Sequence, residues 1–404
     1  MTPFQYRCTT CGRAFSRDEV RYLCPECGPS YRPGMPLVGV LEVVFDYAAI
    51  RAAFNPAQPD WNLFCAVEPE FHPPILVGNT PLSPVARLGA ELGLPSLWVK
   101  NDGLNPSGSL KDRASYLVVA EARRLGMDLI VAASTGNAAS ALAAVCASTD
   151  VKALIFVPET APKAKLVQMV LYGATVVPVK GTYDDAFALS LEYTAKRGGL
   201  NRNTAYHPLT IEGKKTAGLE IWAQLGYQVP EAILISVGDG VILGGVAKAF
   251  QDLKRAGLID RLPRLIGIQA ESSDAIHRYV QSSVYSDAAN PTTRADSISV
   301  TCPSHAHGAR KAILESGGAT LTVTDAEILE AQALLARRSG IFTEPAGATA
   351  LAGLIKLQAG EQRLSTDAPV VILATGHGLK DVEAPLSRIS IPAAVEPRLE
   401  ALSL

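Results

Sequence analysis

The 404-residue sequence has no long hydrophobic run. Its apolar stretches, such as "ALIFVP" and "AILISVG", have the length of β-strands, whereas a transmembrane helix needs about 20 consecutive apolar residues. The first residues, "MTPFQYRCTT", lack the apolar core of a signal peptide. We therefore expect a cytoplasmic protein without a membrane partner.

The sequence also has no excess of either charge, with 37 lysines and arginines against 39 aspartates and glutamates and a net charge of −2. Without a basic excess, nucleic acid is not an expected partner. No internal repeat and no low-complexity tract is evident, and the 48% hydrophobic and 19% charged residues are ordinary for a globular enzyme. We expect a small-molecule substrate, and two domains or one large domain with an appendage.

Cysteine is scarce, but four of the seven cysteines are grouped near the N-terminus. They form two Cys-x2-Cys turns with twelve residues between them: Cys8, Cys11, Cys24 and Cys27. This spacing is close to that of zinc ribbons, in which four thiolates enclose one tetrahedral ion. It predicts a structural Zn2+ site; the alternatives are a disulfide pair or a ribbon that no longer retains its ion.

Most of the remaining sequence alternates between apolar runs and segments with a helical period. Strands are expected at 97–100, 129–133, 153–157, 175–179, 232–237, 265–270 and 370–374, and helices at 110–125, 138–148, 162–172 and 244–256. This alternation predicts an α/β fold with a parallel sheet, whose ligands bind beyond the carboxyl ends of the strands. The polar stretch 282–310 is weakly periodic, and we expect a long loop that covers a site.

The stretch "NPSGSLKDRAS" follows one predicted strand and begins a helix. Ser109 and Asp112 have the spacing of a capping box. Lys111 has the wrong sign for the first turn, because a helix start carries a partial positive charge. A solvated lysine is the ordinary interpretation. If the side chain is partly buried, however, its neutral amine is favoured, and a neutral amine can condense with an aldehyde.

Two further strand ends have the features of anion sites. In "AASTGNAASALAA", Ser134, Thr135, Gly136 and Asn137 lie where the N–H groups of a new helix are free. In "ISVGDGVILGG", a glycine pair precedes a helix whose amides could hold a phosphate, although a tight turn without a ligand is the more common meaning of such a pair on its own. Asp239 between these glycines would have to point away from a phosphate. An aldehyde together with a phosphate describes pyridoxal phosphate.

These motifs resemble a known family. "NTPLSPVARL", "NPSGSLKDRAS", "ASTGNAAS", "IEGKKTAGLEIWAQLG", "SVGDG", "TEPAGATALAG" and "ATGHGLKD" occur in the order of the fold-type II pyridoxal-phosphate enzymes of the tryptophan synthase beta-like superfamily, and the set is most similar to threonine synthases. The resemblance covers about residues 75–385 and implies two three-layer α/β/α domains with mostly parallel sheets. The implied division is a zinc-ribbon-like segment at 1–35, a large domain from 36–108 and 206–395, and a small domain at 109–205. The family also implies a homodimer.

The resemblance assigns roles to individual residues. Lys111 matches the lysine that links covalently to the cofactor and acts as the catalytic base, Asn137 matches the partner of the cofactor's 3′ oxygen, and Thr375 matches the partner of its ring nitrogen. The loop for the substrate carboxylate corresponds to Ser134, Thr135, Gly136 and Ala138. The loop for the cofactor phosphate corresponds to Gly238, Asp239, Gly240, Val241 and Ile242.

The implied reaction is that of a carbon–oxygen lyase, the conversion of O-phosphohomoserine and water into threonine and phosphate. Thr210, however, stands where the family usually has an arginine that holds the substrate phosphate, and a hydroxyl cannot replace a bidentate guanidinium. The alternative is a β-elimination or β-replacement enzyme that acts on serine, threonine or an O-phosphorylated amino acid. A third interpretation is a binding protein built on an inactive enzyme fold. The missing charge could come from Lys214, Lys215, Arg113 or Arg310.

Four other residues allow more than one interpretation. His305 and His307 are spaced for one face of a strand, but no neighbouring cysteine or carboxylate completes a metal site, so we expect surface or lid-loop residues. Glu344 precedes Pro345 at a helix start, where it could cap the helix or take part in catalysis. His377 could line the pocket or pack against the adjacent glycines.

Overall fold

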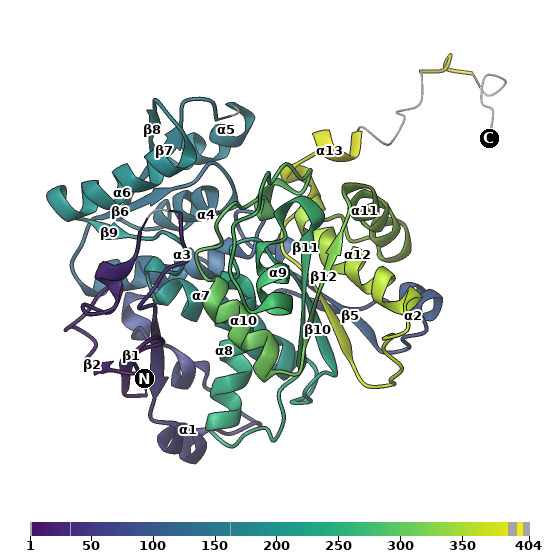
Figure 1. The fold of residues 1–404 in the computed structure, drawn as a ribbon, viewed down its shortest axis with the longest axis horizontal. Helices are drawn as coiled ribbons and strands as arrows, with labels where there is room; N and C mark the ends of the chain where they lie inside the picture. The colour runs from purple at the N-terminus through teal and green to yellow at the C-terminus, as the bar shows by residue number, and fades with distance from the viewer. Residues whose placement is uncertain (1, 33, 162, 387–393, 399–404) are drawn as a thin grey trace.

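The continuous apolar runs of the sequence form the buried strands of two mostly parallel sheets (Figure 1). The computed structural model describes residues 2–32, 34–161, 163–386 and 394–398. The larger sheet has the order β12-β11-β10-β13-β5-β4, in which β4 pairs antiparallel with β5 and the other pairs are parallel. Its strands are β4 (Leu82–Pro84), β5 (Leu97–Asn101), β10 (Ala232–Ser236), β11 (Arg264–Ala270), β12 (Ala319–Val323) and β13 (Val370–Ala374).

Strand β13 shows that the larger sheet is buried on both faces. Val370, Ile372 and Ala374 pack into one hydrophobic cluster, whereas Val371 and Leu373 pack into another. Since alternate residues of a strand point to opposite faces, helices must cover both. One face packs against α7 (Leu209–Gln224), α8 (Val241–Arg255), α9 (Ala275–Ser282) and α10 (Ala306–Glu315). The other packs against α2 (Ala86–Leu92), α11 (Asp325–Ser339) and α12 (Pro345–Ala359).

The smaller sheet is parallel throughout, in the order β8-β7-β6-β9. Its strands are β6 (Leu129–Ala133), β7 (Lys152–Pro158), β8 (Thr175–Val179) and β9 (Leu200–Asn201). The helices of this part of the chain are α3 (Lys111–Arg124), α4 (Asn137–Cys146), α5 (Lys163–Leu171) and α6 (Tyr183–Arg197). Figure 1 shows this sheet and its helices in teal, beside the larger sheet.

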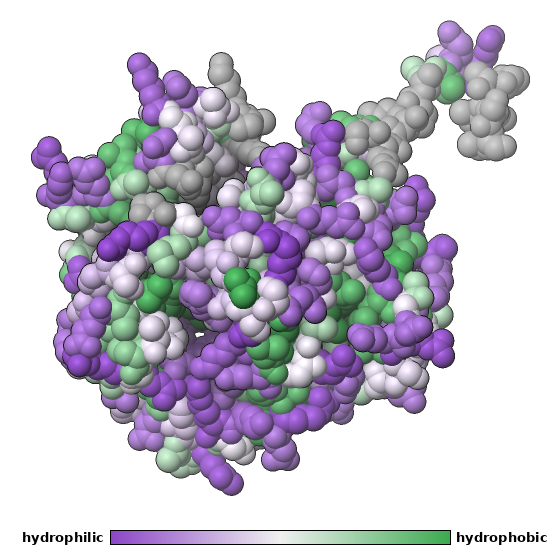
Figure 2. Space-filling view, viewed as in Figure 1, coloured by the Kyte–Doolittle hydropathy of each residue, from purple (hydrophilic) through white to green (hydrophobic). Residues whose placement is uncertain are grey.

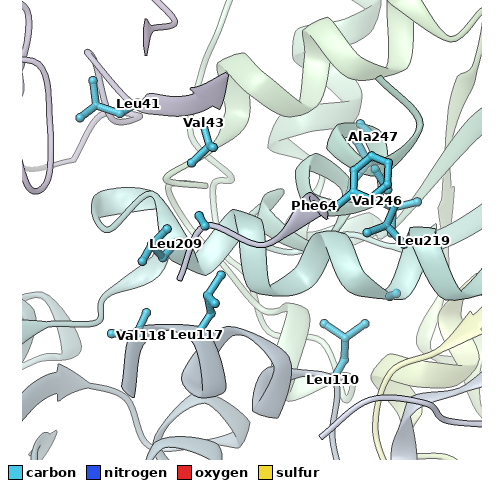
Figure 3. Close-up of a cluster of buried hydrophobic side chains, with 14 of the residues drawn as sticks. Leu41, Val43, Phe64, Leu110, Leu117, Val118, Leu209, Leu219, Val246 and Ala247 are labelled. Atoms are coloured by element: carbon cyan, nitrogen blue, oxygen red, sulfur yellow. The ribbon is translucent and has the colours of Figure 1, made fainter. Parts of the chain in front are cut away.

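Helix α7 lies between α3 and α8. The close-up in Figure 3 shows Leu117 and Val118 of α3 near Leu209 of α7, and Leu219 of α7 near Val246 of α8. All five side chains belong to one buried cluster. Helix α3 covers one side of α7 and α8 covers the other. The side chains of α7 therefore lie between a helix of the smaller sheet and a helix of the larger sheet.

The N-terminal segment forms a third sheet, which is antiparallel and has the order β2-β1-β3. Its strands are β1 (Phe4–Cys8), β2 (Ala14–Phe15) and β3 (Leu41–Phe45), and the helix α1 (Tyr47–Ala53) follows. Leu41 and Val43 of β3 reach the same buried cluster as α7 and α8 (Figure 3). The cysteine-containing segment therefore packs against the core. Near the other end of the chain, the short helix α13 (Glu383–Leu386) comes after β13, the last strand of the larger sheet.

The predicted α/β class with parallel sheets is confirmed. The seven predicted strands correspond to β5, β6, β7, β8, β10, β11 and β13, and the four predicted helices to α3, α4, α5 and α8. Strands such as β9, with two residues, and β12 were not predicted. The domain boundaries remain a prediction.

The stretch 282–310 is irregular only in part. Between α9 and α10 it contains a single 3-10 turn, Asp296–Ile298, but α10 already begins at Ala306. In the described part of the chain, no helix is long and apolar enough to cross a membrane. On the face shown in Figure 2, hydrophilic residues cover most of the surface and hydrophobic residues are scattered, as is usual for a protein without a large apolar patch there.

Candidate active site

The start of α3 and the end of β13 lie side by side, although they are far apart in the sequence. The backbone N–H of Leu110 donates to the carbonyl oxygen of Thr375 at 2.9 Å, and Ser109 pairs with Gly376 in an antiparallel bridge. β13 is parallel to β5, so the two loops leave the same edge of the sheet. This pairing places Lys111 next to Thr375, as the predicted site requires.

Lys111 is a partly buried amine at the first position of α3. Its Nζ has no hydrogen-bond or ion-pair partner within the described ranges. Burial, and then the nearby Arg202 guanidinium, lower the pKa of Lys111 to about 8. The carboxylates of Glu344 and Asp239 oppose this shift. The neutral amine is therefore accessible near neutral pH, in roughly a tenth of the molecules at pH 7, and a neutral amine can act as a nucleophile or a base.

The predicted capping box is wrong. Helix α3 has Leu110 as its N-cap and no side-chain cap. The carboxylate of Asp112 instead accepts hydrogen bonds from the backbone N–H of Ser107, at 2.7 Å, and from its hydroxyl, at 2.5 Å. Ser109 Oγ is buried without a hydrogen-bond partner. A buried hydroxyl without a partner two residues before Lys111 is an unfilled binding group.

The start of α4 also presents polar groups. Gly136 is the N-cap of α4, and its N–H donates to Ser134 Oγ at 3.2 Å. The amides of Asn137 and Ala138, in the first turn, have no intrahelical acceptor, whereas that of Ala139 donates to the carbonyl oxygen of Gly136 at 3.1 Å. Asn137 Nδ2 donates to Glu344 Oε1 at 2.8 Å and to Ser297 Oγ at 3.2 Å. Glu344 makes no side-chain cap at the start of α12, so its side chain serves the site rather than the helix.

A cavity of about 490 Å3 opens at this point. Thr135, Gly136 and Asn137 line it, together with Glu344 and His377. The other predicted site residues lie outside its lining: Lys111, Ser134, Ala138, Gly238, Asp239, Gly240, Val241, Ile242 and Thr375. Two of the four residues predicted to bind the substrate carboxylate, Thr135 and Gly136, thus line the cavity, whereas Lys111 and Thr375 do not.

Lys380 crosses from the C-terminal loop to the helices of the smaller sheet. Its Nζ donates to the carbonyl oxygen of Ser107 at 2.8 Å, to Gln168 Oε1 at 2.7 Å and to Ser140 Oγ at 3.1 Å. Gln168 lies on α5 and Ser140 on α4, so a single side chain joins three elements at the edge of the cavity.

The glycine loop between β10 and α8 is tightly covered. A Cβ on Gly238 would lie 2.8 Å from Ile298 Cα, and Gly240 has a φ of 82°, which favours glycine. Asp239 points its carboxylate at Ser304, whose N–H and hydroxyl donate at 2.5 and 2.8 Å. The backbone amides at the start of α8 are thus left to bind an anion, as expected if Asp239 turns away.

The segment that covers this loop contains the two histidines. His305 is buried over the first turn of α8, where its Nε2 would lie 2.6 Å from a Cβ on Gly244. Burial lowers the pKa of His305 to about 4. His307 is exposed, and Tyr279 Oη lies 3.0 Å from its Nδ1. The two rings therefore form neither a metal site nor an acid–base pair; His305 is a lid residue and His307 a surface residue.

Thr210 does not present its hydroxyl to the site. Its Oγ1 donates to the carbonyl oxygens of His207, at 2.8 Å, and Thr204, and the residue is fully buried. The hydroxyl of Thr210 therefore donates to backbone carbonyls at the start of α7 and is not free to donate to a ligand.

Sequence reasoning missed several members of the site. Arg202 follows the two-residue strand β9, which is too short for a periodic signal, and its Nε donates to Ser115 Oγ on α3 at 3.2 Å. The contact between Asn137 and Glu344 joins residues 207 positions apart. Glu344 itself was a candidate because of its place directly before Pro345, but its contact with Asn137 was not predicted.

The four N-terminal cysteines converge as predicted. Their sulfur atoms lie within 4.8 Å of one another: Cys8, Cys11, Cys24 and Cys27. The N–H groups of Gly12 and Gly28 close the two turns onto the carbonyls of Cys8 and Cys24, at 2.9 and 2.7 Å. The 3.8 Å between Cys11 Sγ and Cys24 Sγ is far longer than the roughly 2.05 Å of a disulfide bond, so the disulfide alternative is wrong.

The chain can be compared with known proteins. The family model described as "Pyridoxal-phosphate dependent enzyme" matches residues 74–376. The threonine synthase of Methanocaldococcus jannaschii is 36% identical over 410 residues, with 98% of each chain covered. The threonine synthase of Methanosarcina acetivorans is 35% identical and covers 99% of this chain and 98% of its own length.

Among solved structures, a threonine deaminase from T.th. is similar, with a TM-score of 0.64 and 29% identity over 74% of this chain and 92% of its own. The deaminase covers only part of this chain, whereas the two synthases match it almost from end to end. The chain belongs to the fold-type II pyridoxal-phosphate-dependent enzymes and is a homologue of threonine synthases over nearly its whole length.

Proposed function

We propose that this protein is a threonine synthase, which converts O-phosphohomoserine and water into threonine and phosphate. The observation that carries the proposal is the placement of Lys111, a partly buried amine with a pKa of about 8, directly beside the end of β13 that carries Thr375. The similarity to threonine synthases over 98% of the chain supports the choice of this reaction within the family.

The donors of the site suit pyridoxal phosphate. Lys111 Nζ has no partner in the described ranges, and Ser109 Oγ is buried with no partner. The amides at the start of α8 are free of the Asp239 carboxylate, which Ser304 holds. We assign Lys111 to the cofactor aldehyde, Asn137 to its 3′ oxygen, Thr375 to its ring nitrogen, and the phosphate to Gly238, Asp239, Gly240, Val241 and Ile242.

Pyridoxal phosphate supplies an electron-accepting ring that stabilises negative charge at the α carbon of an amino acid. The chain's own residues bind and move protons. The start of α4, with Ser134, Thr135, Gly136 and Ala138, holds the substrate carboxylate through free amides and the positive end of the helix dipole. Lys111 takes the α proton and returns one later, because its pKa of about 8 makes both protonation states accessible.

Two coupled assays test the proposal. Purified protein with pyridoxal phosphate should release one phosphate and form one threonine for each O-phosphohomoserine consumed. Formation of ammonia and a 2-oxoacid from threonine or serine, without phosphate release from O-phosphohomoserine, would reject the synthase and support a dehydratase.

A second candidate, a β-elimination or β-replacement enzyme, is favoured by one observation. Thr210 occupies the usual position of the substrate-phosphate arginine, and its hydroxyl is bound to two backbone carbonyls. The side chain at position 210 therefore cannot hold a substrate phosphate and cannot select O-phosphohomoserine over substrates without a phosphate. Serine, threonine and O-phosphoserine are the substrates to include beside O-phosphohomoserine.

We also propose that the four-cysteine cluster holds a structural Zn2+, because four sulfur ligands fill a tetrahedral site. Metal analysis of the purified protein should give one zinc per chain, and Cys24→Ser should remove it. None of the seven cysteines, all of which lie in the described ranges, forms a disulfide bond, and this supports a reducing, cytoplasmic location. The homodimer implied by the family can be tested by light scattering.

A further inference from the structure

Helix α7 passes the starts of two other helices. A Cβ on Gly213 would lie 2.2 Å from the carbonyl oxygen of Arg113, in the first turn of α3. A Cβ on Gly245, one turn into α8, would lie 2.6 Å from Lys214 Cβ. Glycine at both positions lets the helices touch. Lys214 therefore lies where the N-terminal turns of α3 and α8 converge.

Of the four cations that could replace the missing arginine, three are already bound. Lys215 pairs with Glu212 and Asp252, and Arg113 pairs with Asp102 and Glu220 at 2.6 Å each. Arg310 donates to the Tyr279 carbonyl at 3.1 Å and to Ser283 Oγ at 2.7 Å. None of the three is available to a ligand.

Lys214 is different. It is 3% exposed, and its Nζ has no hydrogen-bond or ion-pair partner in the part of the chain that the structure describes. Its surroundings are positive, because the charges of Lys111 and Arg202 both act on it and only Asp239 opposes them. Burial, more than these charges, lowers the pKa of Lys214 well below its usual range.

A buried ammonium surrounded by cations is unfavourable unless an anion completes the site. The N-terminal turns of α3 and α8 lie beside this part of α7, and each helix start adds positive potential. Lys214 also lies one helical turn after Thr210, on the same side of α7. A side chain from this position can reach the region that an arginine at 210 would otherwise serve.

We propose that Lys214 binds a phosphate monoester in the active site and supplies the positive charge that is absent at Thr210. The inference rests on the proposed pyridoxal-phosphate chemistry of this site. Two phosphates have the required chemistry: the phosphate of the cofactor and that of an O-phosphorylated substrate.

Lys214→Gln tests the proposal, with Lys214→Arg as the charge-retaining variant. Lys254→Gln, at an exposed position of α8, is the matched control. Apoprotein is titrated with pyridoxal 5′-phosphate and with pyridoxal, which has no phosphate, and bound cofactor is followed by absorbance. Holoenzyme is then titrated with inorganic phosphate by calorimetry. Circular dichroism and the melting temperature show whether each variant is folded.

If Lys214 binds the cofactor phosphate, Lys214→Gln weakens pyridoxal 5′-phosphate about tenfold or more but leaves pyridoxal unchanged, since a charged hydrogen bond is lost. If it binds the substrate phosphate, cofactor affinity is unchanged and the affinity of holoenzyme for inorganic phosphate falls by a similar factor. In both cases Lys214→Arg restores most of the binding and Lys254→Gln has no effect.

The proposal is overturned if folded Lys214→Gln protein keeps both the ratio of pyridoxal 5′-phosphate to pyridoxal affinity and the affinity for inorganic phosphate. Because both measurements are of binding, they do not depend on threonine formation. A protein that fails to convert O-phosphohomoserine but shows these losses would reject the synthase assignment and keep the role of Lys214.

Discussion

Helix α7 carries two adjacent buried lysines whose surroundings are opposite. Lys215 points to a closed network in which its Nζ meets the carboxylates of Glu212 and Asp252 and lies 4.4 Å from the centre of the Phe45 ring. Lys248 joins the same carboxylates. Lys214 has no such carboxylate partner in the described ranges, and the charges that act on it are mostly positive: those of Lys111 and Arg202, opposed by Asp239.

The two lysines illustrate two roles of a buried charge, one in the stability of the fold and one in the binding of a ligand. In the Lys215 network, each ammonium has a carboxylate, so the folded protein tolerates the burial and the removal of one member is costly. On the Lys214 side, the ammonium of Lys214 has no carboxylate partner in the described ranges, and the charges of Lys111 and Arg202 both act on it, so an anionic ligand would balance it. Loss of stability is thus expected from changes on one side, and loss of binding from changes on the other.

The largest effect is expected at Lys111. Lys111→Ala removes the nucleophile and the base together, so the proposed activity should fall by roughly three orders of magnitude or more. Borohydride treatment and mass spectrometry should find the cofactor attached to Lys111 in the wild type and to no peptide in the variant. Lys254→Ala is the control, and an active Lys111→Ala protein would remove the basis of the proposed function.

At the next position of α7, about 100° around the helix, Lys215→Met should be strongly destabilising. It leaves Glu212 and Asp252 buried with one cation fewer, and breaking such a buried pair costs about 3–5 kcal/mol. Urea denaturation of the apoprotein should show a lower midpoint. The ratio of pyridoxal 5′-phosphate to pyridoxal affinity should not change in protein that remains folded, and a change would show that the two faces of α7 are not separate.

The same substitution at the neighbouring position should have the opposite sign. Lys214→Met removes a buried amine without a partner, so the apoprotein should gain roughly 1–3 kcal/mol of stability. The measurement is again the urea midpoint, without cofactor or phosphate. A loss as large as that of Lys215→Met would mean that Lys214 is a structural residue.

The stretch "IEGKKTAG" contains both Lys214 and Lys215 and shows how much of their difference the sequence could predict. Lys111 could be singled out, because a lysine is unexpected in a first helical turn after a strand. Lys214 and Lys215 could not be told apart, because α7 is buried on nearly all sides and its apolar pattern therefore does not indicate which face points to the site.

Contacts between residues far apart in the sequence were the second feature that the sequence alone could not predict. β5, β7 and β13 were predicted from local apolar runs, which a buried parallel sheet requires. The partner of Asn137 is Glu344, and the backbone partner of Leu110 is Thr375. No local pattern encodes such contacts between distant loops, so from sequence the resemblance to a family was needed to bring Lys111 and Thr375 together.

The smallest predicted effect is on the pH dependence of apoprotein stability. The pKa of Lys111 is about 8 in the folded protein against an ordinary value of 10.5, so between these values the unfolded chain binds more protons. Stability should therefore rise with pH across this window, by at most about 1.4 kcal/mol per pH unit for one group. Below pH 8 the full penalty of the buried charge is present, and above pH 10.5 it is gone.

Lys111→Met removes this contribution, together with the repulsion that the charge of Lys111 exerts on Lys214. Lys100 and Lys380 also have lowered pKa values, and they contribute the same rise to both proteins. The melting temperature of wild-type apoprotein should therefore increase more steeply between pH 8 and 10.5 than that of the variant. Parallel curves would show that the amine of Lys111 titrates normally, and the contrast between the two faces of α7 would then rest on Lys214 alone.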